Sequence, residues 1–294
     1  MKRDLLTISD LGAADFEAIA SRAVELGKCW RERSMPQTLA RTRVGLIEEL
    51  PGWRNPSALS LGAAAMGATC VPINAKLEGP ETVEDLAGYV DNWFDLLGTR
   101  TPHLSSLRVF AGAVEASVVN LRTNDDHPCE ILGDLSFVLH ERGSWDGLRV
   151  AMVGPRGNIA QSWIEATGML PIELVHVTPP EFGFTPDALP DRVTTSDDPR
   201  ALEDADLIVT DCWPDDLDDE AKSVFARLRV DAALLDRCRP DVLFVPCPPV
   251  TRGQEVSADA MSHPNLRSKE AKAFLLHSQN AGMEYCLGDE TIGF

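Results

Sequence analysis

Residues 127–130 read His-Pro-Cys-Glu, and residues 131–139 continue Ile-Leu-Gly-Asp-Leu-Ser-Phe-Val-Leu. The apolar positions of the longer run predict a helix, and the Val-Val-Asn at residues 118–120 indicates a buried strand upstream. His127 and Glu130 therefore stand at the start of a helix that follows a strand. Helix starts carry unpaired backbone N–H groups and the positive end of the helix dipole. We expect this junction to bind a substrate with full or developing negative charge.

Short apolar strands alternate with helical segments on both sides of this junction. Before it, the sequence predicts strands at 44–47, 68–71 and 94–97 and helices at 9–27, 59–67 and 81–91. After it, the sequence predicts strands at 148–153, 172–177, 207–210 and 242–245 and a helix at 159–167. This alternation predicts an α/β fold with parallel sheets flanked by helices.

The length of 294 residues suggests about two domains of roughly 150 residues each. A turn-rich segment, Glu141–Gly147, interrupts the apolar pattern and marks the expected boundary. The N-terminal domain is expected to cover residues 1–142, and the second domain residues 143–267. Residues 268–294 have a helical composition, and we expect this helix to pack back on the first domain.

The chain is strongly acidic, with 27 Lys and Arg against 46 Asp and Glu, a formal net charge of −19 and a pI near 4.6. A nucleic acid would be repelled, and no basic stripe with interleaved aromatic residues reverses this locally. We therefore expect no nucleic-acid partner. An anionic substrate would need a local Arg cluster, so each Arg beside an apolar strand is a candidate ligand.

Seven Cys occur without a CxxC pair or a close Cys/His pair, so the sequence predicts no metal site. The first residues are interrupted by Asp10, Asp15 and Glu17 and do not have the pattern of a signal peptide. No segment approaches the roughly 18 consecutive apolar residues that cross a membrane. We expect a cytoplasmic protein with reduced thiols and no membrane partner.

Several short segments, spread along nearly the whole chain, are informative because of the order in which they occur. The segments are Glu81–Asp85, Arg100-Thr101, residues 127–130, Asn158, residues 211–213 (Asp-Cys-Trp), Cys247 with Arg252-Gly253, and residues 277–279 (His-Ser-Gln). In this order they resemble the aspartate/ornithine carbamoyltransferase superfamily, and residues 211–213 are similar to its ornithine branch. The resemblance implies a transferase that moves a carbamoyl group to or from the amine of an amino-acid-like substrate. It also implies a homotrimer with active sites shared between subunits, and no cofactor.

The resemblance assigns a role to each matching side chain. Arg100, His127 and Glu130 are the expected catalytic residues, and the first two would polarise a carbonyl group. Arg54 would contact the phosphoryl end of the donor. The remaining expected substrate ligands are Asn158, Asp211, Cys247 and Arg252.

The match is weakest at the phosphate loop, which reads Ser-Thr-Arg-Thr-Arg in the superfamily. Here Gly52–Pro56 reads Gly-Trp-Arg-Asn-Pro, so one Arg remains, the hydroxyls are lost and Pro56 lacks a backbone donor. Glu130 replaces a Gln that would accept from the carbamoyl amide. Because like charges about 4 Å apart cost roughly 4 kcal/mol at an effective dielectric near 20, Glu130 argues against a phosphate substrate.

Several candidates also have simpler interpretations. His127 could be a helix-start histidine satisfied by backbone groups, Arg54 an exposed loop residue, and Cys247 a buried, inert thiol. The Asp-Asp-Leu-Asp-Asp-Glu at residues 215–220 is expected to be a solvated acidic loop, with metal binding as the weaker alternative. Val153–Asn158 follows a strand but lacks GxGxxG, which argues against NAD.

Three functions remain open on the sequence. The first is a divergent carbamoyltransferase. The second is a lyase or group-transfer enzyme of the same fold that acts on a ureido, amidino or amide compound without carbamoyl phosphate; Glu130 supports it, because a carboxylate can bind a cationic amidinium. The third is a non-catalytic relative that binds a metabolite.

Overall fold

The computed structural model describes residues 2–288. The chain divides into two compact units. The first contains the residues up to Gly143 together with those from Lys272 onward, and the second contains Ser144–Ala271. Positions 289–294 of the expected C-terminal helix lie outside the described residues.

A parallel sheet of four strands forms the centre of the first unit. The strands are β1 (Arg43–Glu48), β2 (Thr69–Ile73), β3 (Leu96–Arg100) and β4 (Ser117–Arg122), in the order β2-β1-β3-β4. The helices of this unit are α1 (Ala13–Arg31), α2 (Arg54–Ala65), α3 (Val83–Val90), α4 (Leu104–Ala113), α5 (Pro128–Arg142) and most of α9 (Ser268–Leu287).

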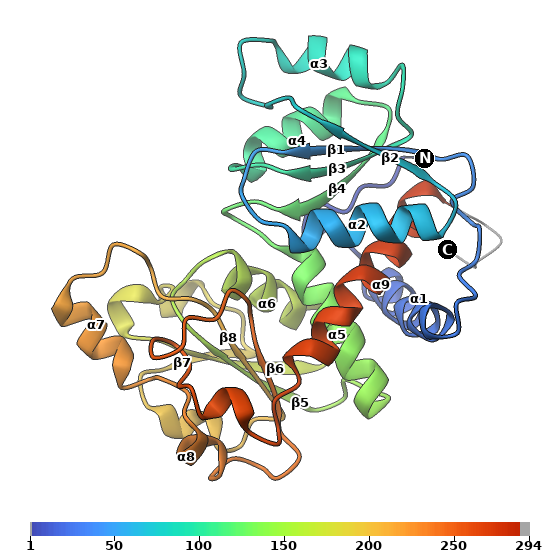
Figure 1. The fold of residues 1–294 in the computed structure, drawn as a ribbon. Coiled ribbons are helices and arrows are strands. Elements are labelled where there is room, and N and C mark those ends of the chain that lie inside the picture. The colour runs from blue at the N-terminus through green and yellow to red at the C-terminus, as the bar shows by residue number, and fades with distance from the viewer. Residues whose placement is uncertain (1, 289–294) are drawn as a thin grey trace. The chain divides into compact units, whose positions relative to one another are not determined.

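Helices cover both faces of this sheet (Figure 1). On one face, Leu97 of β3 belongs to an apolar cluster with Leu86 of α3 and Phe110 of α4. The next residue of β3, Gly98, points the other way, because side chains alternate along a strand. A Cβ at Gly98 would overlap the side chain of Leu59, so α2 packs closely on the opposite face.

Helix α9 packs back on the first unit, as the sequence predicts. Its neighbour there is α5. The contact is close at Gly133, where an added Cβ would lie 3.3 Å from the backbone N and Cα of Leu275. Two polar contacts fasten α9 elsewhere: Ser117 donates to the carbonyl of Cys286 at 3.1 Å, and Arg22 of α1 pairs with Glu284 at 2.9 Å.

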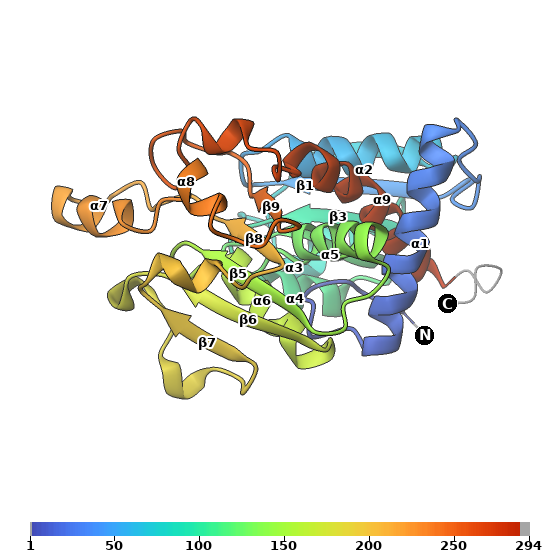
Figure 2. The same cartoon turned by 90° about the horizontal axis from the view of Figure 1, so that it is seen from below.

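The second unit contains a parallel sheet of five strands (Figures 1 and 2). The strands are β5 (Leu148–Val153), β6 (Ile172–Val177), β7 (Val193–Ser196), β8 (Leu207–Thr210) and β9 (Leu243–Pro246), in the order β7-β6-β5-β8-β9. The helices are α6 (Asn158–Met169), α7 (Asp219–Ala226) and α8 (Ala232–Leu235). Both sheets confirm the predicted α/β fold.

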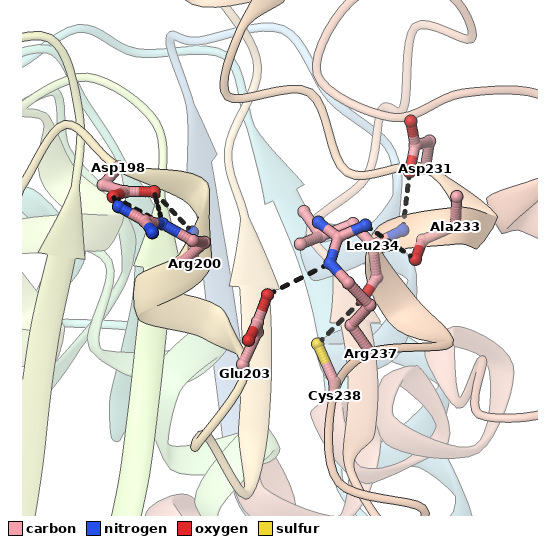
Figure 3. A network of polar contacts seen from close by, with 8 residues as sticks. All are labelled: Asp198, Arg200, Glu203, Asp231, Ala233, Leu234, Arg237 and Cys238. Carbon is pink, nitrogen blue, oxygen red and sulfur yellow. Dashed lines mark hydrogen bonds and ion pairs between the residues drawn. The ribbon is translucent and has the colours of Figure 1, made fainter.

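Short helical segments of the second unit are held by acidic side chains (Figure 3). Asp198 accepts from the backbone N–H of Arg200 at 2.9 Å, and Asp231 caps α8 by accepting from Leu234 N–H at 2.7 Å. Arg237 pairs with Glu203 at 3.0 Å. The Arg237–Glu203 ion pair is exposed and adds little stability, whereas α8 has the Asp231 cap and buries Leu234 in the core of the unit.

Several predicted elements differ in extent from the observed ones. The helix expected at 59–67 begins earlier, at Arg54, because a Pro in the first turn is compatible with a helix. The strand expected at 94–97 is shifted to Leu96–Arg100. The acidic stretch at 215–220 is only partly a loop, since Asp218 caps α7 and α7 begins at Asp219. Three observed elements, α4, β7 and α8, were not among those expected from the sequence.

The α5–α9 contact predicts a large cost for a side chain at Gly133. Gly133→Val should lower the free energy of unfolding by about 1–3 kcal/mol, because the helix backbones cannot both stay in place. The control is Gly88→Val in α3, where an added Cβ meets nothing within 4 Å. That variant should change stability by less than about 0.5 kcal/mol in the same urea titration. Equal losses in both variants would contradict the packing described.

Candidate functional site

The strand order of the first unit reverses direction between β1 and β3. Ligands of open parallel sheets bind at such a switch point, beyond the carboxyl ends of the strands. At this place the loop after β1 meets Arg100, the last residue of β3, and the backbone N–H groups of Glu49 and Leu50 donate to the carbonyl of Arg100 at 2.8 and 3.2 Å. Helix α5 follows the neighbouring strand β4.

Arg100 is 6% exposed and lies under the loop that follows β1. Its guanidinium donates to the carbonyls of Leu50 at 3.1 Å and Pro51 at 2.6 Å. Gly52 has φ +140°, and a Cβ there would overlap the guanidinium. Burial lowers the pKa of Arg100, and the charge of Arg122 lowers it further. Arginine nevertheless stays charged in proteins, so Arg100 places a buried cation at the switch point.

His127 is the N-cap residue of α5 and is 7% exposed. Burial lowers the pKa of His127 to about 4, so the imidazole is neutral at neutral pH. Its Nε2 lies 3.5 Å from Nδ2 of Asn55, whose Oδ1 accepts from Gln279 at 2.8 Å. This chain of polar side chains fixes the ring with elements of α2 and α9. A neutral imidazole at a helix N-terminus can polarise a carbonyl without giving up a proton.

Glu130 lies in the first turn of α5, one turn before Asp134. Lys272 of α9 donates to Glu130 and, at 2.9 Å, to Oδ1 of Asp134. The side chains of Lys272, Glu130 and Asp134 are 14%, 5% and 2% exposed. Burial raises the pKa of Asp134 to about 6, although Lys272 acts in the opposite direction. The three groups form one buried ion cluster, called here the Lys272 cluster.

The remaining loop residues of the first unit offer few anion ligands. Arg54 lies over the indole ring of Trp53, with its guanidinium carbon 5.1 Å from the ring centroid, and Trp53 is 68% exposed. Glu49 accepts from Thr101 at 2.7 Å and from the backbone of Leu77 at 3.1 Å. Arg100, His127 and Glu130 therefore all belong to the first unit. Arg54 stacks instead on the exposed indole of Trp53.

The second unit has its own switch point, between β5 and β8. Gly154 follows β5 and has φ +147°, and a Cβ there would lie 3.3 Å from Asp211, which follows β8. Asn158 is the first residue of α6 and is 9% exposed. Cys247 donates its backbone N–H to Thr210 at 2.9 Å, so Cys247 and Asp211 lie at neighbouring strand ends. Three of the four expected ligands of this unit thus collect at one sheet edge.

The fourth expected ligand, Arg252, is exposed. A residue absent from the sequence-based prediction, Glu255, is buried nearby and accepts from the backbone of Thr251 at 2.6 Å. Burial raises the pKa of Glu255, and the charge of Asp211 raises it further. Glu255 and Asp211 together make this edge acidic, which suits a cationic amine.

Family models match both units. The model described as aspartate/ornithine carbamoyltransferase, carbamoyl-P binding domain, matches residues 3–140, and the corresponding Asp/Orn binding domain matches residues 146–286. The chain belongs to the aspartate/ornithine carbamoyltransferase family. Among its relatives are proteins named ornithine carbamoyltransferase, which places the chain closer to the ornithine branch. That of Acinetobacter baumannii strain AYE is 30% identical over 298 residues, covering 98% of this chain and 97% of that protein. That of Methylococcus capsulatus is 30% identical over 299 residues, covering 97% and 98%.

Solved structures of the carbamoyltransferase family have the same fold. The ornithine carbamoyltransferase of Burkholderia thailandensis E264 superposes with a TM-score of 0.89 at 28% identity, covering 97% of this chain and 98% of that one. The enzyme of Pyrococcus furiosus gives a TM-score of 0.91 at 24% identity, with 98% of each chain covered, and supports the fold alone.

The Lys272 cluster adds a contact to the argument made from the sequence. There Glu130 was taken as an added negative charge that argues against a phosphate substrate; in the structure this carboxylate pairs with Lys272 of α9. The spacing of Glu130 and Asp134 was the available signal. Two carboxylates four residues apart on an otherwise apolar helix share one face, and burying that face requires a cation. The sequence did not show which Lys or Arg supplies it.

Within residues 2–288, no group of three or more His, Cys, Asp or Glu side chains is arranged to hold a metal ion. No helix in the described part of the chain is long and apolar enough to span a membrane. The seven Cys all lie among the described residues and form no disulfide there, and Cys212 alone of these seven is exposed.

The neutral His127 predicts a loss of stability in acid. Its folded-state pKa is about 4, below the usual 6.5, so its contribution is present above pH 6.5 and is lost as the pH falls toward 4. The loss should be on the order of 2–3 kcal/mol. Urea unfolding of His127→Gln at several pH values should therefore show a shallower acid loss than the wild type.

The matched control for this measurement is His103→Gln, since His103 is exposed. Its acid loss should equal that of the wild type. A wild-type slope in His127→Gln would show that His127 is not held neutral by burial.

Proposed function

We propose that this protein transfers a carbamoyl group from carbamoyl phosphate to the amine of an amino-acid substrate resembling ornithine. In this reaction the amine nitrogen attacks the carbonyl carbon, the bond between that carbon and the phosphate oxygen breaks, and inorganic phosphate leaves. The amine loses one proton. The proposal rests on one observation above all: the neutral His127 caps α5, and the buried Arg100 lies close enough for its charge to lower the pKa of His127.

The carbonyl end of the donor fits this junction. As the amine attacks, negative charge develops on the carbonyl oxygen. The guanidinium of Arg100 and the imidazole of His127 are buried groups that can stabilise this charge by hydrogen bonding. Two of the five guanidinium N–H groups already bond to the loop carbonyls of Leu50 and Pro51. We propose that the donor oxygen takes the place of one of these carbonyls.

The amino-acid end is proposed to bind at the switch point of the second unit. Asp211 and the buried Glu255 supply negative charge for a cationic amine. Asn158, at the start of α6, can accept or donate a hydrogen bond to the amino acid. Cys247 lines the same edge. Ornithine is the acceptor named by the relatives, and its two amino groups match an acidic edge. Arg252, whose side chain is exposed, is proposed to bind the carboxylate of the amino acid.

The phosphate end is the least conventional part of the proposed site. Arg54 is the remaining Arg of the loop and must leave the Trp53 ring to contact a phosphate. The lyase alternative depended on the charge of Glu130, and the pairing of Glu130 with Lys272 removes that support. Neither the lyase nor the non-catalytic alternative gains support from the relatives, so carbamoyl transfer is the function we propose. No cofactor is required for this chemistry.

A homotrimer is also part of the proposal. The six exposed large apolar side chains among the described residues all lie in the first unit. Three of them lie close together in the sequence: Trp53 in the loop before α2, Leu61 in α2 and Val71 in the edge strand β2. Their exposure supports burial against another subunit. Seven Cys that form no disulfide support a cytoplasmic location.

The activity is tested with carbamoyl phosphate and a panel of amino acids that includes ornithine, by colorimetric detection of the ureido product. The wild type should form product with a basic amino acid. Arg100→Lys keeps the charge but loses the planar fork, and should lower kcat by about 10²–10³. Arg41→Lys, at an exposed position before β1, should leave kcat unchanged. Absence of ureido product with every amine would contradict the proposed function.

The assembly is tested by sedimentation at several protein concentrations. The mass should correspond to three chains of 32.0 kDa each. Val71→Asp should shift the distribution toward the single chain, because it places a charge on the exposed edge strand. A single-chain mass for the wild type at all concentrations would exclude the trimer.

A further inference from the structure

The Lys272 cluster brings together side chains from the two separate chain segments that form the first unit. Glu130 and Asp134 are one turn apart on α5, and Lys272 is on α9. Lys272 contacts both carboxylates, and all three side chains are largely removed from water. Breaking one partner out of such a cluster leaves an uncompensated buried charge.

The cluster lies beside the groups assigned to the carbonyl. Glu130 is the third residue of the helix that His127 caps. The charges of Glu130 and Lys272 both act on His127, and the charge of Glu130 acts on Arg100. A change of charge in the cluster is therefore felt where the donor is proposed to bind.

The formal charge of the cluster decides whether an anion can bind there. With Glu130 and Asp134 ionised and Lys272 protonated, the cluster carries −1. Without Lys272 it would carry −2 beside the position of a phosphate dianion. An uncharged amide at position 130, as in the superfamily's usual motif, would need no cation beside it. The presence of Glu130 therefore explains the presence of Lys272.

We infer that Lys272 is a specificity-determining positioning residue, which offsets the charge of Glu130 and thereby lets the N-terminus of α5 accept a doubly anionic, phosphate-bearing donor. The inference rests on the proposed function for the identity of the donor, carbamoyl phosphate. It concerns anion binding, however, and anion binding can be measured without turnover. Glu130 and Lys272 then replace one neutral amide as a unit, and neither should be exchangeable alone.

The test is calorimetric titration of the full-length protein with inorganic phosphate at pH 8. Lys272→Met should weaken binding by about tenfold or more, because two like charges now face the dianion. Glu130→Gln/Lys272→Met restores the formal charge of the wild type and should bind within about threefold of it. Lys272→Arg keeps the charge and should stay close to the wild type. A merely structural Lys272 would leave the double variant as weak as Lys272→Met.

The pH dependence gives a second, independent readout. Sulfate serves as the probe here, because it stays a dianion from about pH 5 to 9. Lys272 on α9 and Glu130 act on Asp134, the charge of Glu130 also acts on His127 and Arg100, and Arg122 acts on these last two groups. Between pH 8 and 5.5, His127 stays neutral because its pKa is about 4, and the two Arg side chains stay charged.

Protonation of Asp134, whose pKa burial raises to about 6, should therefore control sulfate binding in this range. Lys272→Met should regain most of its lost affinity as the pH falls from 8 to 5.5, and the wild type should gain less. A flat profile in Lys272→Met would overturn the inference. Should Lys272→Met fail to fold, Glu130→Gln is compared with Glu130→Gln/Lys272→Met, which again differ by one positive charge, and equal phosphate affinities would overturn it.

The two proposals fail separately. A wild type that binds phosphate in a Lys272-dependent way but forms no ureido product would reject carbamoyl transfer and leave the role of Lys272 intact. A wild type that makes product, with Lys272→Met equal to it in phosphate affinity, would reject the role of Lys272 alone. A wild type that binds neither phosphate nor sulfate would overturn the inference directly.

Discussion

The close approach of α5 and α9 is the constraint on which the site of the first unit depends. Gly133 lets the two helix backbones pack at van der Waals distance. Because of this, the end of the chain reaches residues laid down near its middle, and Lys272 contacts Glu130 and Asp134. The same helix supplies Gln279, which holds Asn55 beside the imidazole ring. The packing of α9 on α5 therefore also determines which cation neutralises the buried carboxylates.

Each unit presents functional groups at the switch point of a parallel sheet. In the first unit the groups are cationic or neutral donors, with Arg100 and His127 as the pair suited to a carbonyl oxygen. In the second unit they are acidic, with Asp211 and Glu255 suited to an amine. Each edge by itself therefore carries charge of the sign that its proposed ligand needs.

The sequence was informative about elements and much less so about partners. Strands such as Leu148–Val153 could be predicted because continuous apolar runs between turns are typical of buried parallel strands. Arg100 and His127 were recognisable because each stands at or after the end of a strand, at a fixed place in the motif order. The partner of Glu130 could not be predicted, since a contact across 142 positions in the sequence depends on helix packing. The charge argument made from Glu130 alone therefore did not include Lys272.

A crystal structure with carbamoyl phosphate bound is the most direct test of the account. We predict the carbonyl oxygen within hydrogen-bonding distance of Arg100 and His127, the guanidinium released from at least one loop carbonyl, and Lys272 still in contact with Glu130 and Asp134. A donor bound away from Arg100 and His127, or Lys272 turned from Glu130 toward solvent, would contradict it.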